Sequence, residues 1–126
     1  MDELQPLRVT TARFGADSFV VALAGELDIG TSDRFEQELD TLLDCGARRL
    51  VIDLLGITFL GSVGLGLLTR AAKRTRELGG ECVVVSDDPR ILRVFEITGL
   101  DRVFRMERSL MEAVAQLAGP AAVTVA

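Results

Sequence analysis

The chain has 126 residues, enough for one domain that buries about two-thirds of the surface of its unfolded chain without a metal or disulfide. Acidic residues outnumber basic ones, 19 to 14, so the chain lacks the positive charge that nucleic-acid binding requires. It contains no histidine, tryptophan or tyrosine, which removes the commonest general base, the commonest metal ligand and the best platforms for stacking bases. We therefore expect neither an enzyme nor a nucleic-acid-binding protein.

The cysteines and the apolar segments set further limits. Cys45 and Cys82 have neither paired spacing nor a histidine nearby, so we expect reduced thiols, no bound metal and no cofactor. The first six residues show neither the basic region nor the apolar run of a signal peptide, and a cytoplasmic protein is expected. Residues 50–69 are mostly apolar, but Asp53 and four glycines among them argue against a membrane span.

Short β-rich runs alternate with helical periods along the chain, which is typical of an α/β domain. Residues 7–14 and 18–24 are two expected strands, and the turn between them predicts an antiparallel hairpin. Residues 31–33 start a helix that carries its apolar side chains on one face and ends near Gly46. Residues 48–54 then form a strand that is apolar enough to be buried on both faces.

The second half of the chain continues this alternation. Its expected elements are a helix from Ser62 to about Leu78, a strand at 82–86, a helix from Pro89 to Gly99, a short strand near 103–104 and a helix from about Ser109. Asp88 before Pro89 is a typical helix start, and Gly99 a typical helix end. Ser109 and Glu112 have the spacing of a capping box.

Together these elements predict one α/β domain over residues 1–118 and a flexible tail at 119–126. We expect a mixed, mostly parallel sheet of about five strands, with an antiparallel N-terminal strand, and about four helices. In a parallel sheet the loops that follow successive strands gather at one edge, so residues 25–28 should lie beside Ser62.

Ser62 is the best candidate for a functional residue, because it lies where the apolar strand pattern gives way to a helical one. We predict that it is exposed and is the N-cap of the helix, where unpaired backbone N–H groups and the helix dipole would favour an added phosphate. The simpler interpretation is that Ser62 only caps the helix. The glycines around it match neither a dinucleotide-binding motif nor a P-loop, and Leu60 stands where a nucleophile elbow needs glycine. Any chemistry at Ser62 must therefore come from another protein.

Several short motifs occur in a characteristic order over about residues 7–117. They are Gly25-Glu26-Leu27-Asp28, Asp53-Leu54, the run at 57–66, Gly79-Gly80-Glu81 and the run at 95–100. In this order and spacing the chain resembles the STAS domains, and among them the bacterial anti-sigma factor antagonists.

The resemblance implies a binding module whose unmodified form binds an anti-sigma factor, often a serine-protein kinase, and so releases a sigma factor. The kinase phosphorylates a loop serine, which weakens binding, and a PP2C-type phosphatase reverses the modification. The family loop reads Asp-Ser-Ser/Thr-Gly-Leu with the first serine as acceptor, which corresponds to Ser62; Gly61 and Val63 depart from that pattern. The residues expected to bind the partner are Glu26, Asp28, Thr58, Phe59, Gly61, Ser62, Val63, Gly64 and Leu65.

Two of these residues have alternative interpretations, and a third departs from the family pattern. Asp28 either contacts the partner or is a turn carboxylate, and Glu26 either contacts the partner or belongs to a solvated face. Gly61 in place of the family's aspartate predicts a loop that is more flexible and less negative.

Two other functions stay open on the sequence alone. One is an antagonist that is constitutively competent or is regulated by something other than Ser62, for which oxidation of Cys45 and Cys82 is the only other chemistry that the sequence shows. The other is a STAS sensor of a small ligand, a nucleotide or a lipid, held between Asp28 and the Ser62 loop, although Phe59 is the only aromatic residue of that loop that could hold it. The oligomeric state and the identity of the anti-sigma and sigma factors are not predicted.

Overall fold

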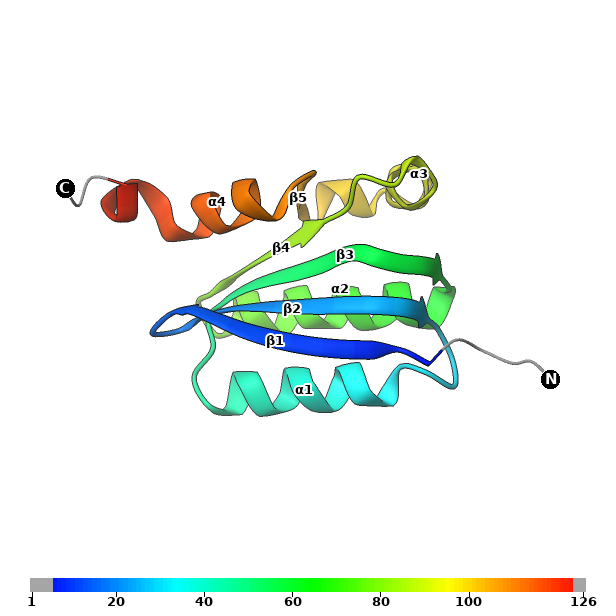
Figure 1. Cartoon of the computed structure of the whole chain (residues 1–126), viewed down its shortest axis with the longest axis horizontal. Helices are drawn as coiled ribbons and strands as arrows, with labels where there is room; N and C mark the ends of the chain where they lie inside the picture. The colour runs from blue at the N-terminus through cyan, green and yellow to red at the C-terminus, as the bar shows by residue number, and fades with distance from the viewer. Residues whose placement is uncertain (1–5, 124–126) are drawn as a thin grey trace.

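The computed structural model describes residues 6–123, and side chains over residues 6–118, as one five-stranded sheet with helices on both faces (Figure 1). The elements in chain order are β1 (Arg8–Gly15), β2 (Ser18–Leu27), α1 (Asp33–Asp44), β3 (Arg49–Leu60), α2 (Ser62–Glu77), β4 (Glu81–Val85), α3 (Pro89–Thr98), the 3-10 turn η1 (Leu100–Arg102), β5 (Arg105–Glu107) and α4 (Leu110–Val123). The strands lie side by side in chain order, β1 is antiparallel to β2, and the other neighbours are parallel. The predicted mixed α/β fold is confirmed.

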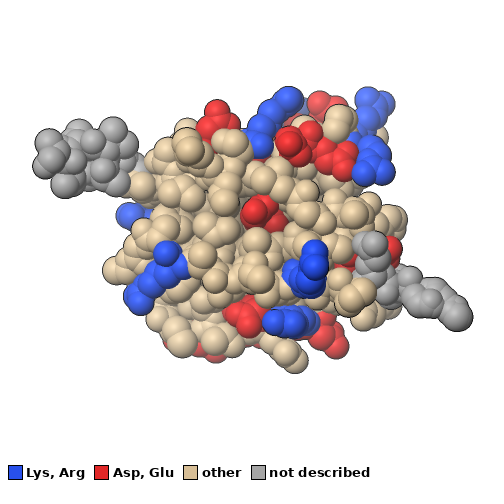
Figure 2. Space-filling model, in the orientation of Figure 1, with Lys and Arg blue, Asp and Glu red and all other residues tan. Residues whose placement is uncertain are grey.

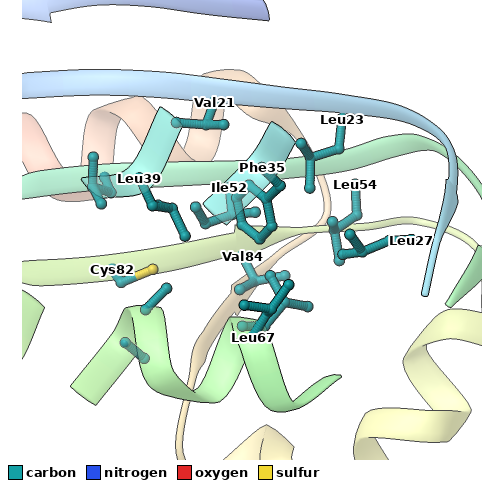
Figure 3. Close-up of a cluster of buried hydrophobic side chains, with 14 of the residues drawn as sticks. Val21, Leu23, Leu27, Phe35, Leu39, Ile52, Leu54, Leu67, Cys82 and Val84 are labelled. Carbon is teal, nitrogen blue, oxygen red and sulfur yellow. The ribbon is translucent and has the colours of Figure 1, made fainter. Parts of the chain in front are cut away.

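The larger part of the core lies between the sheet and helices α1 and α2. Helix α1 contributes Phe35, Leu39 and Leu43, whose spacing of four residues puts them on one helical face. Figure 3 shows the ring of Phe35 among buried side chains of β2, β3 and β4. Burying one such side chain contributes about 1.5–3 kcal/mol, so this face of the sheet anchors both helices firmly.

A smaller core lies on the opposite face of the sheet, under α4. Val51, Val83 and Val85 of the central strands pack there against Ala113 and Leu117 of α4. The expected capping interaction at the start of α4 is present, since the backbone N–H of Glu112 donates to Ser109 Oγ at 3.1 Å. Both faces of β4 and of the first half of β3 are therefore buried, which explains their runs of apolar residues.

Strand β3 is longer than predicted, because it continues from residue 54 to Leu60 instead of ending. Its second half keeps a parallel partner, since β2 extends to Leu27, which lies opposite Leu60. The buried side chains of Ile57 and Leu60 face the core, and the exposed residues between them obscured that pattern in the sequence. This extension carries the chain to the carboxyl edge of the sheet, directly before Ser62.

Two other boundaries near the C-terminus differ from the prediction. The strand expected at 103–104 begins at Arg105, and Phe104 instead packs edge-on against Phe95 of α3, with ring centroids 5.5 Å apart. Helix α4 continues to Val123, although a loose tail was expected from residue 119. The rest of that expected tail, residues 124–126, lies outside the described residues.

Two observations concern a membrane and a nucleic acid as possible partners. None of the helices in the described part of the chain is long and apolar enough to cross a membrane. On the face of the molecule drawn in Figure 2, the described basic and acidic side chains are interspersed and form no continuous basic patch.

Candidate functional site

The ends of β2 and β3 bring the residues of the predicted site together at the carboxyl edge of the sheet (Figure 1). Glu26 pairs with Phe59 and Leu27 with Leu60 in the parallel register. The backbone N–H of Gly61 then donates to the carbonyl of Leu27 at 3.0 Å, which ties the two chain segments together just beyond the strands. The expected closeness of residues 25–28 to Ser62 is thus present in the fold.

Ser62 is exposed, as predicted, but it is the first residue of α2 and not its N-cap. Gly61 is the N-cap, because its backbone is extended and its carbonyl accepts the first intrahelical hydrogen bond, from Leu65 N–H at 3.0 Å. Helix α2 thus begins one residue earlier than an N-cap at Ser62 would place it. The hydroxyl of Ser62 is left at the positive end of the α2 dipole, open to solvent.

Asp28 supplies the side chain that contacts this helix start. Its Oδ1 accepts a hydrogen bond of 3.3 Å from the backbone N–H of Val63. A Cβ atom placed on Gly61 would lie 2.1 Å from the Cγ and Oδ1 of Asp28, so the carboxylate occupies the space that a side chain at position 61 would need. Asp28 is therefore a capping carboxylate in this structure.

Thr31 holds the segment that carries Asp28, and sequence reasoning did not include it in the site. Its Oγ1 donates to the carbonyl of Glu26 at 2.7 Å and accepts from the backbone N–H of Asp28 at 3.1 Å. Its own N–H donates to the carbonyl of Asp28 at 3.2 Å, which closes a turn over residues 28–31. The spacing Asp-x-x-Thr was the available signal, since both residue types favour such turns.

Three exposed apolar side chains belong to the chain segments that meet at this edge, and we call them the loop patch. They are Ile29, which is 72% exposed, Phe59 at 50% and Val63 at 37%. Ile29 follows Asp28 in the turn over residues 28–31, Phe59 is the next-to-last residue of β3, and Val63 follows Ser62 in α2. Ile29 was also missing from the predicted site, because a single exposed isoleucine in a turn has no sequence signature.

The other predicted site residues divide into packing and surface positions. Gly64 is buried, and a Cβ added to it would lie 2.6 Å from the carbonyl oxygen of Leu27, so it allows α2 to approach β2. Leu65 is half-buried and packs against the main core. Thr58 is exposed, and its hydroxyl donates to the carbonyl of Gly25 at 3.2 Å. Glu26 is half-buried at the end of β2.

The two cysteines differ in accessibility. Cys45 is exposed at the end of α1, whereas Cys82 is buried in β4. Burial raises the pKa of the Cys82 thiol to about 12, so that it is protonated at neutral pH. Because the thiolate is the reactive form, Cys82 is poorly suited to disulfide exchange in the folded protein.

The described residues around the site line a cavity and include no cluster of metal ligands. A cavity of about 400 Å³ lies next to this edge of the sheet, and its lining includes Gly25, Gly56 and Thr58 but neither Asp28 nor Ser62. Within residues 6–118, no three acidic or cysteine side chains come close enough to hold a metal ion.

Comparison with known proteins identifies the family. The model of the STAS domain matches residues 9–113. BtrV of Bordetella bronchiseptica, described provisionally as an anti-sigma factor antagonist, is 32% identical over 90 residues, which cover 71% of this chain and 78% of BtrV.

Solved structures agree with this match. An anti-sigma factor antagonist from Mycobacterium paratuberculosis superposes with a TM-score of 0.81 at 29% identity, covering 90% of this chain and 95% of that one. The Bacillus cell fate determinant SpoIIAA in its phosphorylated form shares the fold, with a TM-score of 0.69 at 20% identity over 85% of this chain and 96% of SpoIIAA. The family match covers most of the chain, and relatives in sequence and structure are anti-sigma factor antagonists: the chain belongs to the STAS domain family.

Proposed function

We propose that the protein is an anti-sigma factor antagonist of the cytoplasm. It binds an anti-sigma factor of the serine-kinase type through the loop patch and the start of α2, and thereby frees a sigma factor. The observation that carries this proposal is the position of Ser62, an exposed residue at the start of α2, at the edge of the sheet whose segments carry the loop patch.

The loop patch has the character of a binding surface. Ile29, Phe59 and Val63 come from three different chain segments, and each exposes a large part of its side chain. Burying exposed apolar side chains of this kind against a partner stabilises a complex by about 25 cal/mol per Å² of apolar surface, before the costs of association. Phe59 is the natural anchor, because aromatic residues are enriched in the central, fully buried parts of protein interfaces.

Phosphorylation of Ser62 switches the antagonist off in this proposal. The Oγ of Ser62 attacks the γ-phosphorus of ATP held by the kinase, the bond from that phosphorus to the ADP oxygen breaks, and the hydroxyl proton passes to a base. The chain contains no histidine, so the kinase supplies that base. A PP2C-type phosphatase restores the hydroxyl by hydrolysis.

The size of the effect indicates that the phosphate acts at the interface and not on the fold. A negative group at a helix N-terminus gains about 0.3–2 kcal/mol from the dipole, which is too little to rearrange a packed domain. The same charge pressed into an apolar interface costs several kcal/mol, because it loses water without gaining a partner. The carboxylate of Asp28, already bound to Val63 N–H, adds a like charge beside it.

The alternatives have less support from the structure. Regulation by a Cys45–Cys82 disulfide needs a reactive thiol at Cys82, which burial prevents. A ligand in the nearby cavity would contact Gly25 and Thr58 and not the lining expected for the sensor, Asp28 and the Ser62 loop.

The test is binding to the anti-sigma factors of the source organism, measured by calorimetry for the wild type, Ser62→Ala and Ser62→Asp. Thr41→Asp, at an exposed position near the end of α1, is the matched control for an added charge. We expect wild type, Ser62→Ala and Thr41→Asp to bind with similar affinity. Ser62→Asp should lose roughly a hundredfold or more, as expected for about 3 kcal/mol.

Two results would contradict the proposal. Equal binding by all four proteins would separate Ser62 from regulation, and binding to none of the anti-sigma factors would remove the antagonist function itself.

A further inference from the structure

One face of the sheet is covered only in part. Helices α1 and α2 pack on one face, and α4 lies on the other, where it contacts β3, β4 and β5 (Figure 1). Alternate residues of a strand share a face, so Ala22 and Ala24 of β2 lie on the α4 side, in line with Val20, which packs in the smaller core. Arg8 and Thr10 of β1 pair with these two alanines and are exposed. This part of the face is therefore open to a partner.

Two β-bulges shape the open part of this face. The register between β2 and β3 shifts twice, and each shift places one extra residue in β3. In the first bulge the N–H of Leu55 donates to Asp53 Oδ1 at 2.8 Å, and the second contains Thr58, whose hydroxyl is bound to the opposite strand. The first bulge turns Ile57 toward the core and leaves Gly56 on the open face, whereas regular alternation from Asp53 would do the reverse. The bulge thus puts a glycine where an isoleucine side chain would stand.

The result is a depression with small residues at its bottom, which we call the open trough. Two cavities of about 400 and 410 Å³ share Arg8, Ala24 and Gly56 in their linings, so the depression extends across β1, β2 and β3. Its floor consists of Ala22, Ala24 and Gly56, and its rims of Arg8 and Thr10 on β1 and of Asp53 and Thr58 on β3.

The two rims carry opposite charges. No described residue forms an ion pair or a hydrogen bond with the guanidinium of Arg8, and Asp53 has a second carboxylate oxygen besides the one bound to Leu55 N–H. Arg8 is opposite Ala24 and Asp53 is opposite Ala22, so the two charges are two residues apart along β2. In an extended chain, side chains two residues apart point to the same side. An extended segment that lies along the trough would therefore present one side chain to each charge.

The open trough is continuous with the loop patch. Phe59 is opposite Glu26, the next residue of β2 on this face after Ala24. The distance along β2 from Ala22 to Glu26 is about 13 Å at about 3.3 Å per residue, which accommodates about four residues of an extended segment. A partner held at Phe59 is therefore placed to continue directly into the trough.

We propose that the open trough receives an extended segment of the anti-sigma factor, which places an acidic side chain at Arg8 and a basic side chain, two residues away, at Asp53. This inference rests on the proposed function and extends its interface from the loop patch onto the open face of the sheet. The complementary charges fix the direction and register of the bound segment.

Charge changes on each rim test the proposal by calorimetric titration with the anti-sigma factor. Arg8→Glu should weaken binding by about tenfold or more, and by less at high salt, because salt screens exposed charges. Arg49→Glu makes the same charge change at the exposed start of β3, at the opposite edge of the sheet, and should bind as the wild type does. Asp53→Asn removes the other charge but keeps an acceptor for Leu55 N–H, and should weaken binding by about threefold.

Filling the trough tests its shape without changing its charge. Ala22→Leu should weaken binding by about tenfold, because the larger side chain occupies the space of the bound segment. Ala12→Leu is the matched control, since Ala12 is exposed on the same face of β1 but lines neither cavity. Equal urea midpoints of the two variants would show that the loss does not come from unfolding.

NMR shifts of the backbone amides of Thr10 and Ala22, on addition of the unlabelled anti-sigma factor, would locate the contact. We expect both amides to shift together with that of Val63 in the loop patch. If only Val63 shifts and Arg8→Glu binds as the wild type does, the proposal is overturned and the antagonist function stands. Binding to none of the anti-sigma factors overturns both. Shifts at Thr10 and Ala22 that depend on the concentration of this protein alone would assign the trough to a second copy and also overturn the proposal.

Discussion

Helices α2 and α3 begin in opposite ways, although both follow a parallel strand of the same sheet. At α3, Asp88 is the N-cap and accepts from the N–H of Arg90 at 2.9 Å, and Pro89 is the first helical residue. At α2 the N-cap is Gly61, which has no side chain, and the capping carboxylate comes from Asp28, more than thirty residues earlier in the sequence. One start is built from adjacent residues and the other from tertiary contacts.

The side chains around the two helix starts also differ in character. Asp88 forms an ion pair with Arg90 at 2.9 Å, in a charged and solvated segment. The chain segments that meet at the start of α2 carry the exposed apolar side chains of the loop patch. Exposed charged side chains are ordinary on a protein surface, whereas groups of exposed apolar side chains are typical of interaction sites. This difference supports the proposal that a partner binds at the start of α2.

The largest expected effect comes from removing the aromatic anchor of the loop patch. Phe59→Ala should weaken binding to the anti-sigma factor by about 2 kcal/mol or more, as hot-spot aromatics do, and leave the unfolding free energy nearly unchanged. Met111→Ala is the matched control, because Met111 is 82% exposed on α4, outside the patch. Calorimetric titration would check both variants. If both variants lost the same affinity for the anti-sigma factor, the loop patch would not differ from the rest of the surface in partner binding.

A second test concerns how closely α2 is docked onto β2. A Cβ on Gly64 would meet the backbone oxygen of Leu27 at 2.6 Å, which cannot move without disturbing the strand. Gly64→Ala should therefore lower the unfolding free energy by about 1–3 kcal/mol. Gly66→Ala, in the same helix but with open space around it, should raise that free energy by up to about 1 kcal/mol through helix propensity.

Urea unfolding of both variants would measure the difference. Stabilisation by Gly64→Ala would show that α2 is not in close contact with Leu27, and would weaken the placement of Ser62 that depends on it.

The contrast between the two helix starts also explains what the sequence could predict. The boundaries of α3 were predicted from Asp88, Pro89 and Gly99, because these residue types favour helix ends whatever the rest of the fold. Ser62 was correctly expected to be exposed at a helix start, because the change from strand to helix periodicity is visible in the sequence.

The details of the Ser62 site were not predictable in the same way. The extension of β3 to Leu60 depends on its pairing with β2. The strand ends directly before Gly61, which is the N-cap in place of the predicted Ser62. The role of Asp28 depends on the empty space at Gly61, which only the folded arrangement shows. Ile29 and Thr31 were missed for the same reason. Their turn lies at the site only because the ends of β2 and β3 are neighbours in the sheet.

The smallest expected effect concerns the locally capped helix, and it appears in acid. Hydrogen bonds from the side chain and the backbone of Arg90 lower the pKa of Asp88 below its usual 3.8. A carboxyl group whose pKa is lowered by folding stabilises the native state above the unfolded pKa, and this contribution disappears as the pH falls through the folded value. The contribution of Asp88 to stability at the start of α3 should therefore decline as the pH falls below 3.8.

Urea midpoints of the wild type and Asp88→Asn, measured between about pH 2 and 5, would test this expectation. Asparagine still caps the helix but does not titrate, so Asp88→Asn should lose less stability on acidification than the wild type. Asp87→Asn, at the exposed neighbouring position, is the matched control and should follow the wild type. Because Asp88 is paired within its own helix turn, the difference should be small and should not alter backbone amide exchange at Val63. A change at Val63 would mean that the two helix starts are coupled through the sheet, which contradicts the separation drawn between them.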